Sequence, residues 1–176
     1  MNFGLFCIHS EDLPSRAGAR RREWEDTCMP VIEIRDASDG DLPGILRVLA
    51  ESGIDGGLSF TVEEARAHLA RIRGGSSFRL LVALVDGEIA GTYSLVILEK
   101  LGKRGARSGV VEDVGVPPQR QGRGIGRAMM AHALEECRRA GCYKLALSSN
   151  VKREGAHRFY ESLGFERHGY SFAVFL

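Results

Sequence analysis

Glycine occupies every second position of the stretch 121–126, which reads Q-G-R-G-I-G. An apolar run at 110–116 precedes this stretch, and a helical pattern at 127–140 follows it. A glycine-rich loop between a strand and a helix N-terminus exposes unpaired backbone N–H groups, and the helix dipole adds partial positive charge. The spacing therefore predicts a site for phosphate groups, to which Arg123 and Arg127 can add charge-assisted hydrogen bonds.

Three known phosphate-binding patterns can be compared with this loop. A P-loop needs Lys followed by Ser or Thr after its last glycine, but Arg127 and Ala128 stand there. A dinucleotide-binding loop needs G-x-G-x-x-G and an acidic residue near the end of the next strand. Here that strand ends A-L-S-S-N at 146–150, without an acid. The third pattern, Q/R-x-x-G-x-G/A, is matched throughout 121–126.

With this third pattern, the sequence resembles the GNAT superfamily of acyl-CoA N-acyltransferases. The resemblance is detailed from about Glu112 to Phe172, looser over 31–111, and does not extend to 1–28. The nearest small-molecule enzymes are aminoalkylphosphonate acetyltransferases, which 147–160 resembles, and glucosamine-6-phosphate acetyltransferases, which V-E-D-V at 111–114 resembles. Other matching segments are G-C-Y-K-L at 141–145, N-V-K-R at 150–153 and A-H-R-F-Y-E-S-L-G-F at 156–165.

The resemblance implies an N-acetyltransferase that moves an acetyl group directly from acetyl-CoA to the primary amine of a small molecule. It also implies that the backbone at 114–116 pairs with the pantetheine arm of CoA, while the glycine loop holds the pyrophosphate. No metal is expected, and no residue is a candidate covalent nucleophile. The residues expected to contact CoA are Val114, Gly115, Val116, Gln121, Gly122, Arg123, Gly124, Ile125, Gly126, Arg127, Asn150 and Tyr160.

Two residues are candidates for the chemical step. Glu112 can accept the ammonium proton, directly or through water, or orient the amine, and partial burial would raise its pKa toward useful basicity. Tyr160 resembles the family tyrosine near the CoA sulfur. A phenol suits protonation of a thiolate because its pKa of roughly 10 is close to that of a thiol. Each residue has a structural alternative, Glu112 as a carboxylate bonded to loop backbone and Tyr160 as a core residue on an apolar helix face.

Other candidate site features also have two interpretations. Gly115 marks either a close approach of the cofactor or simple packing, and Asn150 either contacts pantetheine or forms a turn. Phe60 and the 52–60 loop are candidates for acceptor contact or an anchored surface loop. The basic loop at 99–108 either attracts an anionic group of the acceptor or is merely solvated.

Hydrophobic periodicity predicts an α/β (α+β) domain. We expect a mixed, mostly antiparallel central sheet with helices on both faces, in which parallel strands at 110–116 and 143–148 splay apart to admit the cofactor. Asp86-Gly87 predicts a hairpin, and T-x-x-E at 61–64 predicts a capping box, followed by a helix that buries Val62, Ala65, Leu69 and Ile72. The other predicted elements are a strand at 31–35, hairpin strands at 78–85 and 88–98, helices from Leu42 and over 154–163, and one or two final strands over 165–176.

Composition excludes several classes of protein. A net charge of +1 over 176 residues gives no reason to expect nucleic acid or an anionic membrane as partner. No apolar run approaches the roughly 18 residues needed to span a bilayer. The cysteines, Cys7, Cys28, Cys137 and Cys142, lack zinc-ligand spacing, and no secretory signal is visible. We therefore expect reduced thiols in a cytoplasmic protein.

The first 28 residues differ in composition from the rest, so we expect a flexible arm or extension at 1–28 and the acetyltransferase domain at 29–176. Members of the resembling family often dimerise, so a homodimer is an expectation, although the sequence shows no distinct interface stripe. Two other functions stay open: an acyl-CoA-binding module without catalysis, and an acetyltransferase that modifies proteins.

Overall fold

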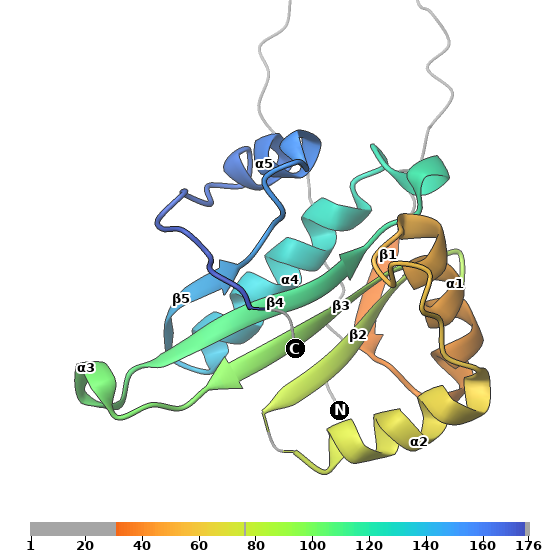
Figure 1. Ribbon diagram of the computed structural model, residues 1–176, viewed down its shortest axis with the longest axis horizontal. Coiled ribbons are helices and arrows are strands. Elements are labelled where there is room, and N and C mark those ends of the chain that lie inside the picture. The colour runs from red at the N-terminus through yellow and green to blue at the C-terminus, as the bar shows by residue number, and fades with distance from the viewer. Residues whose placement is uncertain (1–30, 76, 175–176) are drawn as a thin grey trace, which may run out of the picture.

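The computed structural model describes residues 31–75 and 77–174. The predicted arm at 1–28, with Cys7 and Cys28, lies outside the described residues. Within these described residues, five strands form one sheet in the order β1-β2-β3-β4-β5 (Figure 1). The strands are β1 (Ile32–Asp36), β2 (Phe78–Val85), β3 (Glu88–Leu98), β4 (Arg107–Gly115) and β5 (Cys142–Leu147). Among the described strands only β4 and β5 pair in parallel, and the other neighbours are antiparallel. The predicted mixed sheet is confirmed.

Helices cover both faces of the sheet (Figure 1). Side chains of β2 alternate between two hydrophobic clusters because successive residues of a strand point to opposite faces. Leu81 and Ala83 pack toward α4 (Ile125–Arg139), whereas Val82 packs toward Ile45 of α1 (Leu42–Ser52). The helices are α1 (Leu42–Ser52), α2 (Val62–Arg73), α3 (Gly102–Gly105), α4 (Ile125–Arg139) and α5 (Glu154–Glu161), with 3-10 turns at Asp39–Asp41 and Pro118–Arg120. None of the helices that the structure describes is long and apolar enough to cross a membrane.

Local signals in the sequence placed several element ends correctly. The β2–β3 hairpin turns at Asp86 and Gly87, which both have positive φ, as a tight two-residue turn requires. The capping box before α2 is present, with Thr61 and Glu64 bonding each other's backbone N–H. One detail was wrong: Val62 is exposed, because α2 makes its contact with α1 from Ala65 onward.

Two predicted segments differ in the structure. The loop expected at 99–108 contains the short turn α3, and β4 begins already at Arg107, because the β3–β4 ladder continues to Leu98 and Ser108. The final strands expected after Phe165 are absent from 165–174. There the backbone has no strand partner among the described residues, and its apolar side chains Tyr170, Phe172 and Val174 are exposed.

Candidate active site

The parallel strands β4 and β5 separate before β4 ends. Their pairing runs from Arg107 opposite Cys142 to Val111 opposite Leu147, but β4 continues to Gly115. The last four residues of β4 therefore have no described strand on their β5 side, although Glu112 and Gly115 still pair with β3. Backbone N–H and C=O groups at such an edge can bond an extended ligand as another strand would. The predicted splay is confirmed.

A β-bulge at Asp113 sets the direction of the side chains at the splay. Thr92 lies opposite Gly115 and Ser94 lies opposite Glu112, so β4 has one residue more than β3 between these pairs. Asp113 has a φ of 52°, which places its backbone in the left-handed region. The bulge thereby changes which side chains of the following residues face each side of the sheet.

The two candidate catalytic residues approach the splay from opposite faces of the sheet. Glu112 shares a face with its cross-strand partner Ser94. This face is opposite to that of Tyr93, which packs against α4. Tyr160 belongs to α5 and packs against the same cluster as α4. An acceptor and a cofactor can therefore reach the gap from different sides.

Glu112 has the environment of a moderately basic carboxylate. Its side chain is solvent accessible, and its pKa is raised, first by burial and second by the negative charge of Asp113. Within the described residues it forms neither a salt bridge nor a hydrogen bond through its side chain. The alternative of a carboxylate bonded to loop backbone is therefore not what the structure shows, and the catalytic role stays a prediction.

Tyr160 is held by aromatic packing. Its ring centroid lies 5.1 Å from that of Phe159 and 5.7 Å from that of Phe165. Burial raises the pKa of the phenol, and the positive charge of Arg153 partly opposes this rise. A phenol that remains protonated above its ordinary range can donate a proton or a hydrogen bond at neutral pH. No role was assigned to Arg153 from the sequence. Its position seven residues before Tyr160, about two helical turns, could have indicated that the two side chains lie on one side of the helix.

The glycine loop has the geometry of an anion-binding helix start. Gly122 has a φ of 74° and Gly124, the N-cap of α4, a φ of 81°. No other atom lies within 4 Å of a β-carbon added at either position, so the space beside these backbone groups is open. Gly126 is glycine for another reason, because a β-carbon there would meet the ring of Phe159. The chain around α4's N-terminus thus fits a phosphate group.

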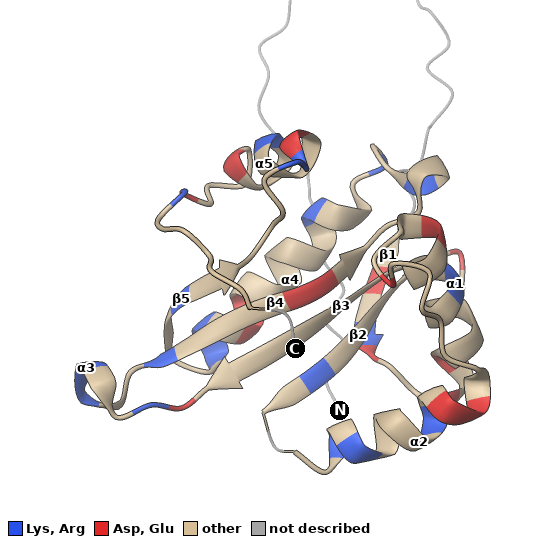
Figure 2. Cartoon of the chain, viewed as in Figure 1, with Lys and Arg blue, Asp and Glu red and all other residues tan. Residues whose placement is uncertain are grey.

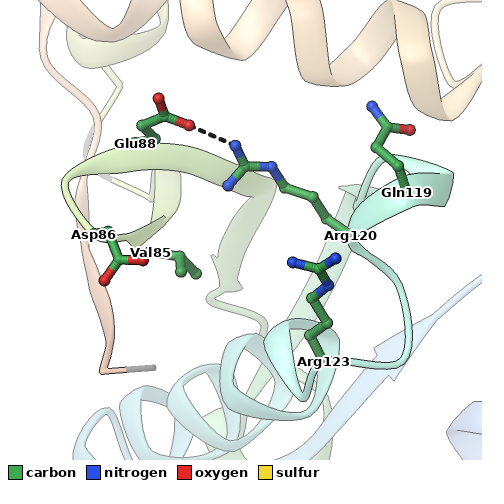
Figure 3. Close-up of a pocket in the computed structure, with 6 residues that line it drawn as sticks. All are labelled: Val85, Asp86, Glu88, Gln119, Arg120 and Arg123. Atoms are coloured by element: carbon green, nitrogen blue, oxygen red, sulfur yellow. Dashed lines mark hydrogen bonds and ion pairs between the residues drawn. The ribbon is translucent and has the colours of Figure 1, made fainter. Parts of the chain in front are cut away.

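The polar side chains of the glycine loop have different surroundings. Gln121 donates from Nε2 to the carbonyl of Val116 at 3.0 Å and so ties the loop to the end of β4. Arg127 is exposed. Arg123 extends into a cavity of about 530 Å³ beside the β2–β3 turn (Figure 3), whereas Arg120 in the same cavity pairs with Glu88 at 2.5 Å. Val85, Asp86 and Gln119 complete the lining. Sequence reasoning missed this cavity because its walls come from segments about thirty positions apart.

This cavity is not the proposed reaction centre. Neither Glu112 nor Tyr160 lines it. It lies on the side of the glycine loop that faces the β2–β3 turn, whereas α5 packs on the loop through Phe159.

Asn150 and Gly115 also serve the fold. Asn150 accepts a hydrogen bond from the backbone N–H of Lys152 at 2.9 Å, and so forms a turn between β5 and α5. A β-carbon on Gly115 would lie 3.0 Å from Oγ of Ser52 and 3.1 Å from Cγ1 of Val48. Packing against α1 thus suffices to explain this glycine. Contact of either residue with CoA stays a prediction.

Charge is distributed unevenly along β4. Figure 2 shows acidic residues at the splay and basic residues at α3, at the opposite end of the strand. Glu112 lies five positions after Arg107, which corresponds to roughly 17 Å along a strand. The hypothesis that the basic loop attracts an anionic group of the acceptor is therefore not supported by its position.

Comparison with known proteins agrees with this geometry. Residues 43–165 match the model of the acetyltransferase (GNAT) family, and the chain belongs to this family of acyltransferases. It is 35% identical to a glucosamine 6-phosphate N-acetyltransferase of Trypanosoma brucei brucei, over 78% of this chain and 90% of the relative. It is 32% identical to an aminoalkylphosphonate N-acetyltransferase of Salmonella typhimurium, over 87% and 95%.

A solved structure shares the fold. A putative acetyltransferase from Agrobacterium tumefaciens superimposes with a TM-score of 0.75 at 30% identity, over 82% of this chain and 99% of that one. The predicted family and fold are therefore confirmed. The curated relatives are named for acetylation of amines of small molecules.

Proposed function

We propose that this protein transfers an acetyl group from acetyl-CoA to the primary amine of a small molecule, without a covalent enzyme intermediate. One observation carries the proposal: β4 and β5 separate between Glu112 on one face and Tyr160 on the other, next to an open helix N-terminus. Membership of the acetyltransferase family supports the same activity.

The residues around the splay fit CoA. The unpaired edge of β4 over 112–115 suits the amide groups of pantetheine, and the open backbone at Gly122 and Gly124 suits its pyrophosphate. Arg127 can add a charge-assisted bond. When bound, acetyl-CoA supplies the activated acetyl thioester.

In this proposal the protein moves two protons. Glu112, with its raised pKa, takes a proton from the ammonium group of the acceptor, directly or through water, so that a neutral amine is available. Tyr160, whose pKa is raised by burial, donates a hydrogen bond or proton to the departing sulfur. Neither role needs a metal ion or a second nucleophile.

The acceptor is proposed to be a small amine that enters from the α1 side, where Glu112 points. Phe60 and the predicted loop at 52–60, whose first residue belongs to α1, remain candidates to contact it. Phe60 is 48% exposed and stacks on His68 at 5.2 Å, so an apolar surface is available there. The acidic pair Glu112 and Asp113 of β4 favours a positively charged acceptor over a strongly anionic one.

The decisive measurement is release of free thiol from acetyl-CoA with a panel of amines. The panel holds aminoalkylphosphonates, amino sugars, polyamines, amino acids and aminoglycosides. Acetylation of one class that depends on both Glu112 and Tyr160 supports the proposal. CoA binding without turnover of any small amine would contradict it, and would favour a binding module or a protein acceptor instead.

A further inference from the structure

Two cysteines that the proposed mechanism does not use lie next to each other where α4 ends. Gly141, just after the helix, has a φ of 69°, and its N–H donates to the carbonyl of Arg138 at 3.0 Å. A left-handed glycine with this bond is typical of a helix end at which the next residue folds back onto the last turn. Here the next residue is Cys142, and the residue of the last turn that such a fold places beside it is Cys137.

The surroundings of the two thiols agree with this contact. Cys137, which is 4% exposed, belongs to the hydrophobic cluster between α4 and the sheet, and the partly buried Cys142 packs against that cluster. The sulfur of Cys137 lies against β4, because a β-carbon added to Gly109 would collide with it. Nη1 of Arg107 donates to the carbonyl of Ala140 at 3.1 Å and holds the helix end on the same strand. The folded chain thus brings the two cysteines together before any reaction.

The two thiols differ in reactivity. Burial raises the pKa of the Cys137 thiol to about 12, and the neighbouring Cys142 contributes to the rise through its charge and a hydrogen bond. A thiol with a raised pKa is rarely ionised at neutral pH, and the thiolate is the form that reacts with oxidants. Cys142 is the more accessible of the two, so an oxidant that reaches this end of α4 should react there first.

We propose that Cys137 and Cys142 are a peroxide-sensitive pair that closes to a disulfide between the end of α4 and the start of β5. The sulfur of Cys142 attacks one oxygen of hydrogen peroxide, and the O–O bond breaks. Cys142 becomes a sulfenic acid, while hydroxide leaves and takes up the thiol proton as water. The sulfur of Cys137 then attacks that of Cys142, the S–O bond breaks, and a second water leaves with the proton of Cys137. Two thiols and one peroxide give one disulfide and two waters.

The product can be reduced again. A disulfide protects both sulfurs from further oxidation to sulfinic acid, which thiols do not reverse. Small thiols open a disulfide by thiol–disulfide exchange. Cys137 lies thirteen positions after Gly124, about 20 Å along a helix, so the cross-link is remote from the glycine loop. The test of this proposal therefore needs no acceptor amine, and its outcome is independent of the proposed acetyl transfer.

The first test is peroxide treatment of a full-length variant with Cys7→Ser and Cys28→Ser, in which Cys137 and Cys142 are the cysteines that remain. Titration of free thiols should show loss of both, and dithiothreitol should restore both. The treated protein should keep the mass of one chain under non-reducing conditions. Two thiols that stay free, or a disulfide that joins two chains, would overturn the proposal.

Digestion with trypsin then locates the bond. Trypsin cuts after Arg138 and Arg139, between the two cysteines, so their peptides, 128–138 and 140–144, normally separate. A disulfide within the chain keeps these two peptides joined until dithiothreitol is added. Separate peptides in the treated sample, with each cysteine oxidised to sulfinic acid, would show that the two sulfurs do not reach each other.

Two further substitutions in this variant test the order of attack. Cys137→Ala should leave Cys142 as a sulfenic acid, which dimedone traps. Cys142→Ala should leave Cys137 as a free thiol that iodoacetamide labels only after unfolding. Sulfenic acid on Cys137 in place of Cys142 would contradict the proposed order. The thiol titration and the peptide digestion keep both cysteines and do not depend on the folding of these variants.

Discussion

A β-carbon added to Gly126 would lie 3.0 Å from Cζ of Phe159. Gly126 is the second residue of α4 and directly follows the glycine loop, and Phe159 is the neighbour in sequence of Tyr160. This contact fixes the distance between the glycine loop and the helix that carries the proposed acid. The two halves of the candidate site are thus joined by one close approach of a ring to a backbone.

Gly126→Val should separate α5 from α4. We expect a loss of about 1–3 kcal/mol of unfolding free energy, since overpacking forces neighbours apart. The cost should be smaller in a Phe159→Leu background, because leucine lacks the Cζ atom. Urea unfolding of the two single variants and the double variant measures this coupling. Strictly additive costs would show that the two residues do not limit each other.

Tyr160→Phe should lower kcat by about 100-fold, within the range for loss of a general acid, while the KM for acetyl-CoA changes little. The ring contacts with Phe159 and Phe165 do not need the hydroxyl. Tyr143→Phe is the matched control, because Tyr143 bonds Lys100 at the opposite end of β5. Equal kcat for the Tyr160 variant and the unmodified enzyme would leave Tyr160 as a packing residue.

Glu112 should be visible in the pH dependence of kcat/KM. Its raised pKa predicts that activity rises with pH above the ordinary glutamate value of about 4.3 as the carboxylate forms. Asp113→Asn removes the neighbouring negative charge and should move this rise to lower pH. Glu112→Gln should remove it and lower kcat/KM by about 100-fold. If Asp113→Asn does not change the pH at which kcat/KM rises, the rise belongs to another group, such as the acceptor amine.

Gly124→Val should abolish CoA binding. No protein atom would meet a β-carbon at this position, so the side chain would occupy the space in which a phosphate is expected. The φ of 81° adds a cost of about 1–2 kcal/mol for any other residue. Gly53→Val is the control, since Gly53 ends α1 with a φ of 68° and equally open space. Calorimetric titration should show CoA binding to the control variant, and undiminished binding to the Gly124 variant would contradict the loop assignment.

Asp41 should stabilise the fold at neutral pH but not in strong acid. It accepts hydrogen bonds from Arg35 at 2.6 and 2.8 Å and from Ser38, and Arg35 holds the pKa of its carboxyl far below the ordinary range. A depressed pKa gives stability that is present above the unfolded pKa of about 3.9 and is lost as pH falls below it.

Asp41→Asn should therefore cost about 2 kcal/mol at pH 7. The difference from the unmodified protein should shrink as the pH is lowered through 4 toward 2. Asp39→Asn, which breaks the more exposed ion pair with Arg73, should cost less than about 1 kcal/mol. Thermal unfolding across this pH range measures both variants, and a pH-independent difference would argue against the linkage.

Local signals explain which parts of the fold the sequence could predict. The hairpin at Asp86 and Gly87, the capping box at Thr61 and the loop at 121–126 each depend on a few adjacent residues, and all were placed correctly. The final strands were not, because a strand needs an edge to pair with, and period-two alternation does not reveal whether one is available. The helical turn α3 lies in a polar stretch without periodicity, so the sequence carried no signal for it.

In the candidate site too, some features could be predicted from adjacent residues and others could not. The positions of Glu112 and Tyr160 in their strand and helix followed from sequence, but the bulge at Asp113 did not, because its left-handed backbone occurs at a residue that is not glycine. The sequence also could not separate two uses of glycine. Gly124 is open on its outer side, while Gly115 is closed by α1, and only the distances distinguish them.

The extra residue in β4 also determines which genetic changes this strand can tolerate. Because of this residue, Glu112 and Gly115 point to the same face of the sheet although they are three positions apart in the sequence. Deleting one residue between Glu112 and Gly115 would remove the bulge and leave a regular ladder, in which Glu112 keeps its partner Ser94 and Gly115 its partner Thr92. Loss of one codon at this place would therefore spare the packing of Gly115 against α1, and its effect would fall on the bend of the strand at the proposed site.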